Sequence, residues 1–594
     1  MPPSLEGLTP QQTQEMVRDD WHSAVESRHE LEERKLKSYK LYRAWRDELA
    51  GHGRTGKGPF GWSKLTVPLI FWVTETTLPR IGVQPPTVIV NAKSPEAVPY
   101  AQAKQMRIQH HLREARMEEE LLIALKSMLI LGDGIVKIPW NPEQRQPGFL
   151  AVNWWDWFVS PEAERWHTAE ICFHRTWHTR RDLERLARRE DGEGKPLYDH
   201  DAIEALASMG TQRSASDPTW QARKDTQGIG WSIYARGDEP VPVIEAWYKD
   251  GARVTFGGDD LGLILRVVDG DDYMHRTPKG QPYRPFSVFQ NTPDLFSPYS
   301  ISDAEMLEGH QAELSTLRNQ YIDQITMNLN APLGYDNRRV RPEQIDAAFG
   351  QPGGKFGTDG PPQDAIARFT PGSTSRDFSE VYDNVRGEAQ IVAGVSDYAA
   401  GMGAAPGVDN QTATGISLIT QEANKRFQAK LKFVELAMRR VANIYDWLDR
   451  SLGSAPIYTM PENAPMPGED MMGVEMMGKM AMVSGAPNDR GLEYDIEVDA
   501  GAMAPPAGQE QARKVMTMLQ AISAMPPQAQ EAVDWNGLLK QVIEAHGMEP
   551  DRVLNPVPPM GMGGVPGMPG EVPVGPPEPV DEGEVPVGPP EPVG

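Results

Sequence analysis

Cysteine, basic charge and long apolar runs are scarce in this sequence, and each shortage excludes a class of protein. Only one cysteine is present, Cys172, so the chain forms no intrachain disulfide and no zinc site built from several cysteines. The 59 Lys and Arg residues stand against 83 Asp and Glu residues, which gives a formal net charge of −24. Such a chain is not a general coat for nucleic acid, because an acidic surface repels phosphate wherever basic groups do not cluster.

The apolar runs are too short to cross a membrane. Leu65–Val73 and Leu121–Leu131 are the best candidates, and both fall well below the roughly 20 apolar residues that span a bilayer. The first segment, MPPSLEGLTPQQTQEMVRDD, lacks the basic start and apolar core of a signal peptide. We therefore expect a protein without a membrane partner, made in a reducing cytoplasm or in a particle assembled there.

Amphipathic segments predict a series of helices. In the first third these are 11–50, 63–82 and 101–131, the last of them ended by Gly132 and Gly134.

Three more helices are expected after Pro298. They are Ser302–Leu329, with Ser302 as its N-cap, then Phe378–Val395, and then Thr412–Leu452. At about 1.5 Å per residue the last would be about 60 Å long, which suits an elongated or oligomeric body.

Short β-branched or aromatic runs predict strands in the middle of the chain. The turns GGDD and DGDD favour hairpins over calcium loops, because the downstream Glu of an EF-hand is missing. Helices together with such strands indicate an α+β fold. The expected strands lie in 134–140, 149–160, 171–177, 241–248 and 253–273.

The C-terminal part differs in composition from the rest. Residues 453–594 contain 6 basic and 21 acidic residues, and GEVPVGPPEPV occurs at 570–580 and again at 583–593. A strand is expected at 494–502 and a helix at Gln509–Met525. Beyond residue 552 the chain buries too little apolar area to fold, so we expect a disordered acidic Pro/Gly arm.

The glycine-rich basic loop Gly51–Gly58 invites comparison with a nucleotide site. Gly51, Gly53 and Gly56 fit G-x-G-x-x-G, but Gly58 stands where a P-loop has the Ser or Thr that binds magnesium, and a predicted helix rather than a strand precedes the loop. These departures favour a flexible basic loop, and no cofactor is expected.

No pattern predicts a metal site or a nucleophile. His110 and His111 are neighbours on a helix and point about 100° apart, and an HExxH spacing is absent. Cys172 lies in an apolar strand pattern. The tryptophans of WWDW at 154–157 are expected to pack in a core or a subunit interface rather than to stack on bases, because no basic residues alternate with them.

The order of elements from 285 to 452 resembles the portal proteins of tailed bacteriophages. PFSVFQNTPDLFSPYSISDAEML opens a helix, a Gly/Pro excursion follows, and a second helix leads to GVSDYAAGM and then TATGIS. GDGIVKIPW at 132–140 and AVNWWDWFVSPEA at 151–163 resemble the wing of that family.

The resemblance implies the architecture of a ring subunit. Its parts would be an N-terminal α+β wing (1–300), a first stem helix (301–330), a clip (331–377), a second stem helix (378–395), a tunnel loop (396–411), a long wing helix (412–452), a crown-like region (453–552) and the arm (553–594).

The resemblance also implies a function and its partners. Such proteins form a homo-oligomeric ring, usually of twelve subunits, at one capsid vertex of the virion. The terminase large subunit packages double-stranded DNA through the ring, a head–tail adaptor docks on it, and the DNA leaves through it at infection. The major capsid protein and a scaffolding protein are further partners. The portal is not an enzyme, because ATP hydrolysis belongs to terminase.

Carried onto this sequence, the family pattern names three sets of residues. The expected channel-lining carboxylates are Glu305, Glu308, Asp323, Glu380, Asp383 and Glu388. The expected clip docking residues are Arg338, Arg339 and Arg341. The expected tunnel-loop residues are Asp397, Tyr398, Gly401, Met402, Gly403, Gly407 and Asp409.

Two alternatives stay open at this stage. One is a virion protein that is not a portal, such as a collar or internal protein, which needs no pair of helices around a clip. The other is a nucleotide-binding, DNA-processing enzyme that uses Gly51–Gly58, for which ATP binding lost on Lys57→Ala would be evidence.

Overall fold

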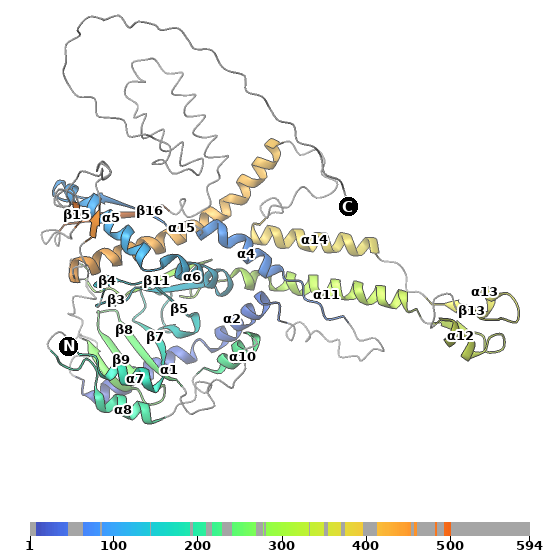
Figure 1. The fold of residues 1–594 in the computed structure, drawn as a ribbon, viewed down its shortest axis with the longest axis horizontal. Coiled ribbons are helices and arrows are strands. Elements are labelled where there is room, and N and C mark those ends of the chain that lie inside the picture. The colour runs from blue at the N-terminus through green and yellow to red at the C-terminus, as the bar shows by residue number, and fades with distance from the viewer. Residues whose placement is uncertain are drawn as a thin grey trace, which may run out of the picture. The chain divides into compact units, whose positions relative to one another are not determined.

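The computed structural model combines helices with small antiparallel sheets, as the predicted α+β class requires (Figure 1). All described residues belong to the first of two units, Met1–Pro505. The predicted tunnel loop, the helix at 509–525, the arm and the loop Gly51–Gly58 lie outside the described residues. The structure describes residues 8–45, 63–82, 86–142, 144–190, 194–209, 217–227, 240–268, 277, 281–331, 333–349, 355–369, 375–395, 413–452, 457–459, 481–483 and 492–499.

The helical segment predicted over 11–50 consists of two helices in its described part, with a turn at Ser27 and Arg28 between them. Helix α1 (Pro10–Glu26) packs on the largest sheet, whereas α2 (His29–Tyr42) packs on α11 and α6, whose bounds are given below. The buried Arg28 lies between the two helices and donates to the backbone oxygens of Trp154 and Trp155. Different packing partners therefore divide a segment whose local pattern favours continuous helix.

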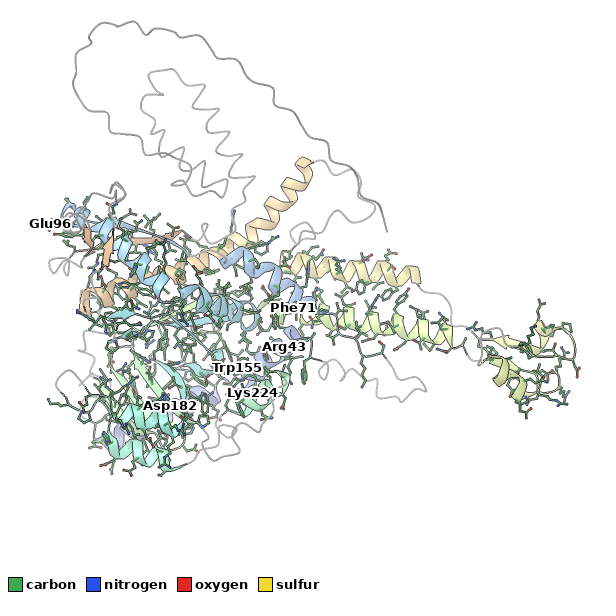
Figure 2. The ribbon with its side chains drawn as sticks, viewed as in Figure 1. Arg43, Phe71, Glu96, Trp155, Asp182 and Lys224 are labelled. Carbon is green, nitrogen blue, oxygen red and sulfur yellow. The ribbon has the colours of Figure 1, made fainter. Side chains whose placement is uncertain are left out.

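The predicted helix 63–82 begins later than expected. Helix α4 (Leu69–Gly82) starts after Pro68, and residues 63–68 contain no helix. Phe71 of α4, labelled in Figure 2, packs against the ring of Tyr42 in α2 with 5.5 Å between the centroids. None of the described helices combines the length and apolarity that a bilayer crossing requires.

The predicted helix 101–131 is two helices. A 3-10 turn, η1 (Pro95–Ala97), leads into α5 (Val98–Glu114), and α6 (Met117–Leu131) follows after Arg116, whose φ of 51° breaks the helical path. The break lets α5 cover strand β1 while α6 packs on β2 and α4.

The predicted end of this segment at Gly132 is confirmed. Gly132 caps α6 with a φ of 97°, and a Cβ atom there would lie 2.1 Å from the Ser300 carbonyl oxygen. Only glycine combines this backbone angle with so close an approach.

The middle of the chain forms a five-stranded antiparallel sheet in the order β10-β9-β8-β7-β6. Trp21 of α1 packs edge-on against Phe158 and Phe173 of this sheet, with centroids 4.6 and 5.5 Å apart. The hairpin predicted from GGDD is confirmed between β9 and β10. The strands are β6 (Trp157–Val159), β7 (Ile171–His178), β8 (Val241–Tyr248), β9 (Arg253–Gly257) and β10 (Leu263–Val268).

Three helices follow strands or loops of this region. Helices α7 and α8 pack together, and α8 also packs on β10, while α10 packs on α2. Thr179 begins α7 through a capping box with Asp182. Their bounds are α7 (Arg180–Ala187), α8 (His200–Met209) and α10 (Pro218–Gln227).

A second sheet joins distant parts of the chain in the order β11-β2-β5. Its strands are β2 (Asp133–Lys137), β5 (Leu150–Val152) and β11 (Phe286–Gln290), with the small hairpin of β3 (Trp140–Asn141) and β4 (Gln146–Pro147) and the 3-10 turn η2 (Trp154–Asp156) nearby. The WWDW tryptophans of η2 and β6 lie buried in the largest apolar core, as the packing interpretation expected.

The strand predicted near residue 494 pairs with the N-terminal half of the chain. Strand β1 (Thr87–Ala92) and β16 (Tyr494–Asp499) form an antiparallel pair from Thr87↔Asp499 to Ala92↔Tyr494. Buried Val88 and Val90 of β1 and Ile496 of β16 belong to the same core. A further pair consists of β14 (Ile457–Thr459) and β15 (Ala481–Val483).

Candidate functional site

The helix predicted at Ser302–Leu329 is confirmed as α11 (Asp303–Leu329). Ser302 caps it, because its hydroxyl oxygen accepts the backbone N–H of Glu305 at 3.1 Å. Lys430 of the long helix α15 (Ala413–Leu452) holds Asp303 in the first turn at 2.6 Å. The start of α11 is therefore fixed both by its cap and by an ion pair that lies mostly out of solvent.

One face of α11 carries a ladder of polar side chains, Gln311, Ser315, Asn319 and Asp323, spaced four residues apart. Each accepts one backbone N–H from residues 63–70, a segment that runs along the helix in the opposite direction. The donors are Ile70 to Gln311 (2.9 Å), Val67 to Ser315 (3.1 Å), Leu65 to Asn319 (2.7 Å) and Ser63 to Asp323 (2.8 Å).

The ladder explains why residues 63–68 are not helical. The N–H groups of Ser63, Leu65 and Val67 bond to side chains of α11 instead of to carbonyls of a helical turn. Gln311 also donates to the Leu41 carbonyl at 3.0 Å and thereby connects α11 to the end of α2. These contacts are not apparent from the sequence pattern. The one signal that could have revealed them is the row of polar residues at every fourth position of α11.

The helix predicted at Phe378–Val395 is confirmed as α14 (Ser375–Ala393), which packs along α11 (Figure 1). Tyr321 of α11 stacks on Phe378 of α14, with centroids 4.2 Å apart and planes 9° apart. Val385 and Ala389 are buried on the same side of α14. The opposite side of α14 is exposed.

The region between the two stem helices has a small core of its own. Strands β12 and β13 pair, and Val340, Ile345 and Ala365 are buried beside them. Arg368 donates to the carbonyl oxygens of Asn328 and Leu329 at 3.1 and 2.9 Å and so ties this region to the end of α11. Its elements are β12 (Leu333–Tyr335), α12 (Pro342–Phe349), α13 (Pro362–Ala365) and β13 (Ile366–Arg368).

The three arginines expected at the clip differ in surroundings. All three are exposed. Arg339 lies 3.6 Å from a carboxylate oxygen of Asp336 and 4.0 Å from one of Asp364, so its charge is partly balanced. Arg338 uses its backbone N–H, not its guanidinium, to bind Asp336. Arg338 and Arg341 therefore present their charges to solvent.

The six expected channel carboxylates fall into two groups. On α11, Glu305 pairs with the buried Lys35 at 2.5 Å, Glu308 pairs with Lys37, and Asp323 is buried in the ladder. On α14, the other three side chains are exposed; they are Glu380, Asp383 and Glu388.

Titratable groups elsewhere act as parts of the core. Among the described residues no cluster of three or more His, Cys, Asp or Glu could hold a metal. Burial lowers the pKa of His174, which lies beside Lys137 and Glu245. Burial raises the pKa of Cys172, whose sulfur accepts from Arg284 at 3.3 Å. A neutral, buried thiol of this kind is a poor nucleophile.

The comparison with protein families identifies the chain as a phage portal protein. A model described as the phage SU10 portal protein matches residues 141–550. Since the match covers more than half of the chain, this chain belongs to the phage SU10 portal protein family. The family is structural and not enzymatic. No curated protein matches the sequence.

Proposed function

We propose that copies of this chain form a ring around a channel at one capsid vertex, through which double-stranded DNA is packaged and later leaves. The observation that carries the proposal is the pair α11 and α14, which is continued by a small clip-like region within the span of a portal family match. The family match favours this function over that of a collar or internal virion protein.

The charge of α14 supports a channel that does not grip DNA. Glu380, Asp383 and Glu388 lie on its exposed side, where they would face phosphates without neutralising them. Each phosphate neutralised by a basic group adds affinity and would slow sliding. We assign the channel surface chiefly to these three residues, because Glu305 and Glu308 pair with lysines of their own chain.

The clip supplies a docking surface in this proposal. The exposed guanidinium groups of Arg338 and Arg341 would meet acidic groups of the terminase large subunit during packaging and of the head–tail adaptor afterwards. The tunnel loop 396–411, with Gly401, Gly403 and Gly407, would move against the passing DNA. The rest of the assembly would contact the major capsid protein and a scaffolding protein.

Negative-stain electron microscopy of the purified protein tests the ring. End-on class averages are expected to show about twelve subunits around an open hole, the number that the family resemblance implies. Because isolated portals can remain unassembled, the same measurement is made on protein produced together with the capsid and scaffolding proteins of its phage. Absence of rings in both preparations would contradict the proposal.

A further inference from the structure

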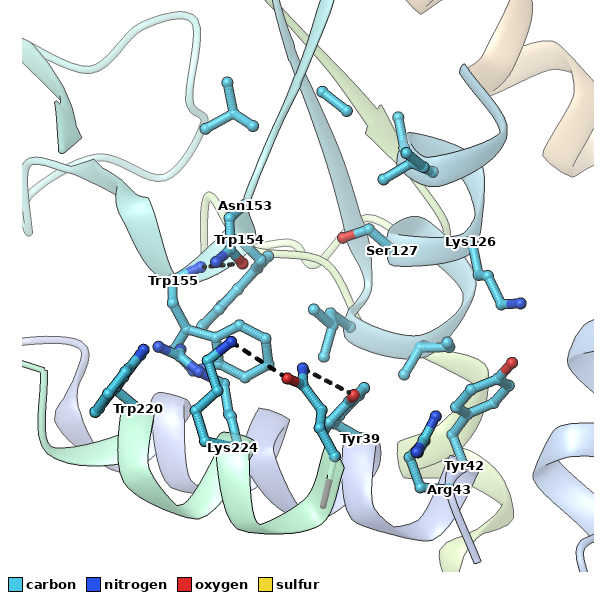
Figure 3. A pocket seen from close by; sticks show the side chains of 18 residues that line it. Tyr39, Tyr42, Arg43, Lys126, Ser127, Asn153, Trp154, Trp155, Trp220 and Lys224 are labelled. Atoms are coloured by element: carbon cyan, nitrogen blue, oxygen red, sulfur yellow. Dashed lines mark hydrogen bonds between the residues drawn. The ribbon is translucent and has the colours of Figure 1, made fainter. Parts of the chain in front are cut away.

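A pocket of about 550 Å³ lies among helices α2, α6 and α10 and the loop before η2 (Figure 3). Tyr39 and Tyr42 from α2, Lys126 and Ser127 from α6, and Lys224 from α10 surround it. The lining residues are Tyr39, Tyr42, Arg43, Ile123, Ala124, Lys126, Ser127, Ile130, Leu131, Ala151, Val152, Asn153, Trp154, Trp155, Trp220, Arg223, Lys224 and Gln227.

The charge of this lining is opposite to that of the chain. Four lining residues are cationic and none is a carboxylate, in a protein of net charge −24. Lys126 pairs with Glu75, and Arg223 pairs with Asp217. In the described part of the chain, no carboxylate lies within ion-pair distance of Arg43 or Lys224. Among the described residues, no carboxylate balances these two positive charges, which would favour an anionic ligand.

Two buried donors in the lining also lack acceptors. The Arg223 Nη1 and Trp155 Nε1 atoms have no hydrogen-bond partner among the described residues, and the two side chains are only 6% and 4% exposed. The Arg223 guanidinium lies over the Trp155 ring at 4.3 Å, which holds both in place. An unsatisfied buried donor costs about 1–3 kcal/mol, and because both atoms are themselves covered, a ligand brings acceptor oxygens to them only when the lining side chains shift.

The remaining walls are aromatic and aliphatic. Tyr39 meets Trp155 edge-on at 6.4 Å, and Ile130, Leu131 and Val152 contribute apolar surface. Aromatic walls of this kind bind proline-rich peptides, because the polyproline II conformation is already extended and presents its rings to flat aromatic faces. Cations beside such walls select peptides that also carry carboxylates.

We propose that this pocket binds the acidic proline-rich repeat GEVPVGPPEPV from the C-terminal arm of a neighbouring copy of the chain. The repeat occurs twice, at 570–580 and 583–593, and supplies Pro and Val for the apolar walls and Glu for the cations. No Lys or Arg follows Arg552. Roughly 70 residues separate Asp499 from Gly570, and at about 3.5 Å each they span up to about 240 Å, enough to reach another subunit. The proposal needs a second copy but no channel, so it stands apart from the proposed function.

Cysteine cross-linking between two co-expressed, differently tagged full-length chains tests the contact. One chain carries Gln227→Cys at the exposed edge of the pocket and the other carries Val574→Cys in the repeat. The native Cys172 is fully buried and adds no background. Glu96→Cys replaces Gln227→Cys as the matched control, because Glu96 is exposed and lies far from Lys224 (Figure 2).

After mild oxidation of assemblies that contain both tags, we expect at least fivefold more interchain disulfide with Gln227→Cys than with Glu96→Cys. Adding Glu571→Lys and Glu578→Lys to the arm is expected to reduce the yield to the control level. Equal yields at positions 227 and 96 would overturn the proposal. In a second experiment, the Gln227→Cys chain alone is treated with a thiol reagent in the presence of either the synthetic repeat peptide or an oligothymidine. The peptide is expected to slow modification of the introduced thiol. Protection by the oligothymidine and not by the peptide would overturn the proposal, because it would show that the pocket binds nucleic acid.

Discussion

Leu65 and Asn319 exchange two hydrogen bonds. The Leu65 N–H donates to the Asn319 side-chain oxygen at 2.7 Å, and the Asn319 amide donates to the Leu65 carbonyl at 2.9 Å. Four residues of an α-helix rise about 6.0 Å, and two residues of extended chain rise about 6.6 Å. A polar side chain at every fourth helical position therefore meets nearly every second N–H of an extended segment. The helix acts toward residues 63–67 much as a neighbouring strand would.

Removing one rung of the ladder is expected to destabilise the subunit. Gln311→Leu leaves the buried Ile70 N–H without a partner and removes one of the hydrogen bonds that the Leu41 carbonyl accepts, at a cost of about 1–3 kcal/mol. The measurement is the free energy of unfolding in urea. Gln320→Leu is the matched control, because Gln320 is exposed on the same helix and its replacement should change stability by less than about 0.5 kcal/mol. Equal effects of the two changes would show that the ladder adds nothing.

Reversing the charge of the exposed side of α14 is expected to slow DNA passage. Lysines at positions 380, 383 and 388 would bind phosphates, so DNA packaged per minute in a reconstituted reaction should fall several-fold, and the loss should lessen as salt is raised. The isosteric variant Glu380→Gln, Asp383→Asn, Glu388→Gln keeps the shape without adding positive charge and should package at nearly the normal rate. A lysine variant that packages normally would place these side chains away from DNA.

An apolar edge of α14 is expected to contact the next subunit. Val381 and Val392 are each 43% exposed, and residues eleven apart lie on the same side of a helix. Val381→Asp with Val392→Asp would bury charge in that contact, so rings should be lost in electron micrographs while the circular dichroism of the subunit is unchanged. Val381→Thr with Val392→Thr keeps the side-chain shape and should retain most rings. If the Asp variant forms as many rings as the wild-type protein, this edge of α14 is exposed to solvent in the ring and does not contact the next subunit.

His111 is expected to make stability fall in mild acid. Burial lowers its pKa to about 4, with Asp449 raising the pKa and Arg107 and His110 lowering it. Below about pH 6.5, the ordinary pKa of histidine, His111 binds a proton in the unfolded chain but not in the folded chain. The free energy of unfolding therefore decreases as pH falls from about 6.5 toward 4. Between pH 7.5 and pH 5 this amounts to about 2 kcal/mol.

The contribution of His111 is measured by comparison with His111→Phe. Phenylalanine keeps a ring beside Tyr445, on which His111 stacks at 6.4 Å, but it cannot titrate. The wild-type protein should therefore lose about 2 kcal/mol more than the variant between the two pH values, because all other titrating groups are shared. Parallel losses would mean that His111 is accessible to protons in the folded state.

The helices α11 and α15 were predictable because their signals are local. Ser302 as an N-cap before a long run of helix-forming residues gives the start of α11, and the regular apolar steps in α15 give its full length. The break at Arg116 has no such signal, since apolar residues continue at helical spacing on both sides. There the separate packing of α5 on β1 and of α6 on β2 decides the backbone.

The hydrogen bonds that connect α11 to residues 63–70 and to the clip-like region were not predictable, for a different reason. Polar residues along one side of a helix normally indicate a solvated face, so Gln311, Ser315 and Asn319 suggest solvent rather than a bound segment. Their partners lie about 250 residues earlier in the chain. The same holds for Arg368, whose exposed side chain gives no hint that it binds the carbonyls at the end of α11.

The pairing of β1 with β16 has a consequence for how the subunit is made. About 400 residues separate the two strands, and ribosomes add roughly 5–20 residues per second. Strand β16 is therefore synthesised about 20–80 s after β1. During that time the edge of β1 and its apolar Val88 and Val90 are open to pairing with other nascent chains. Closure of this sheet is thus a late event of synthesis, and a chaperone that shields the emerging residues 87–92 would raise the yield of assembly-competent subunits.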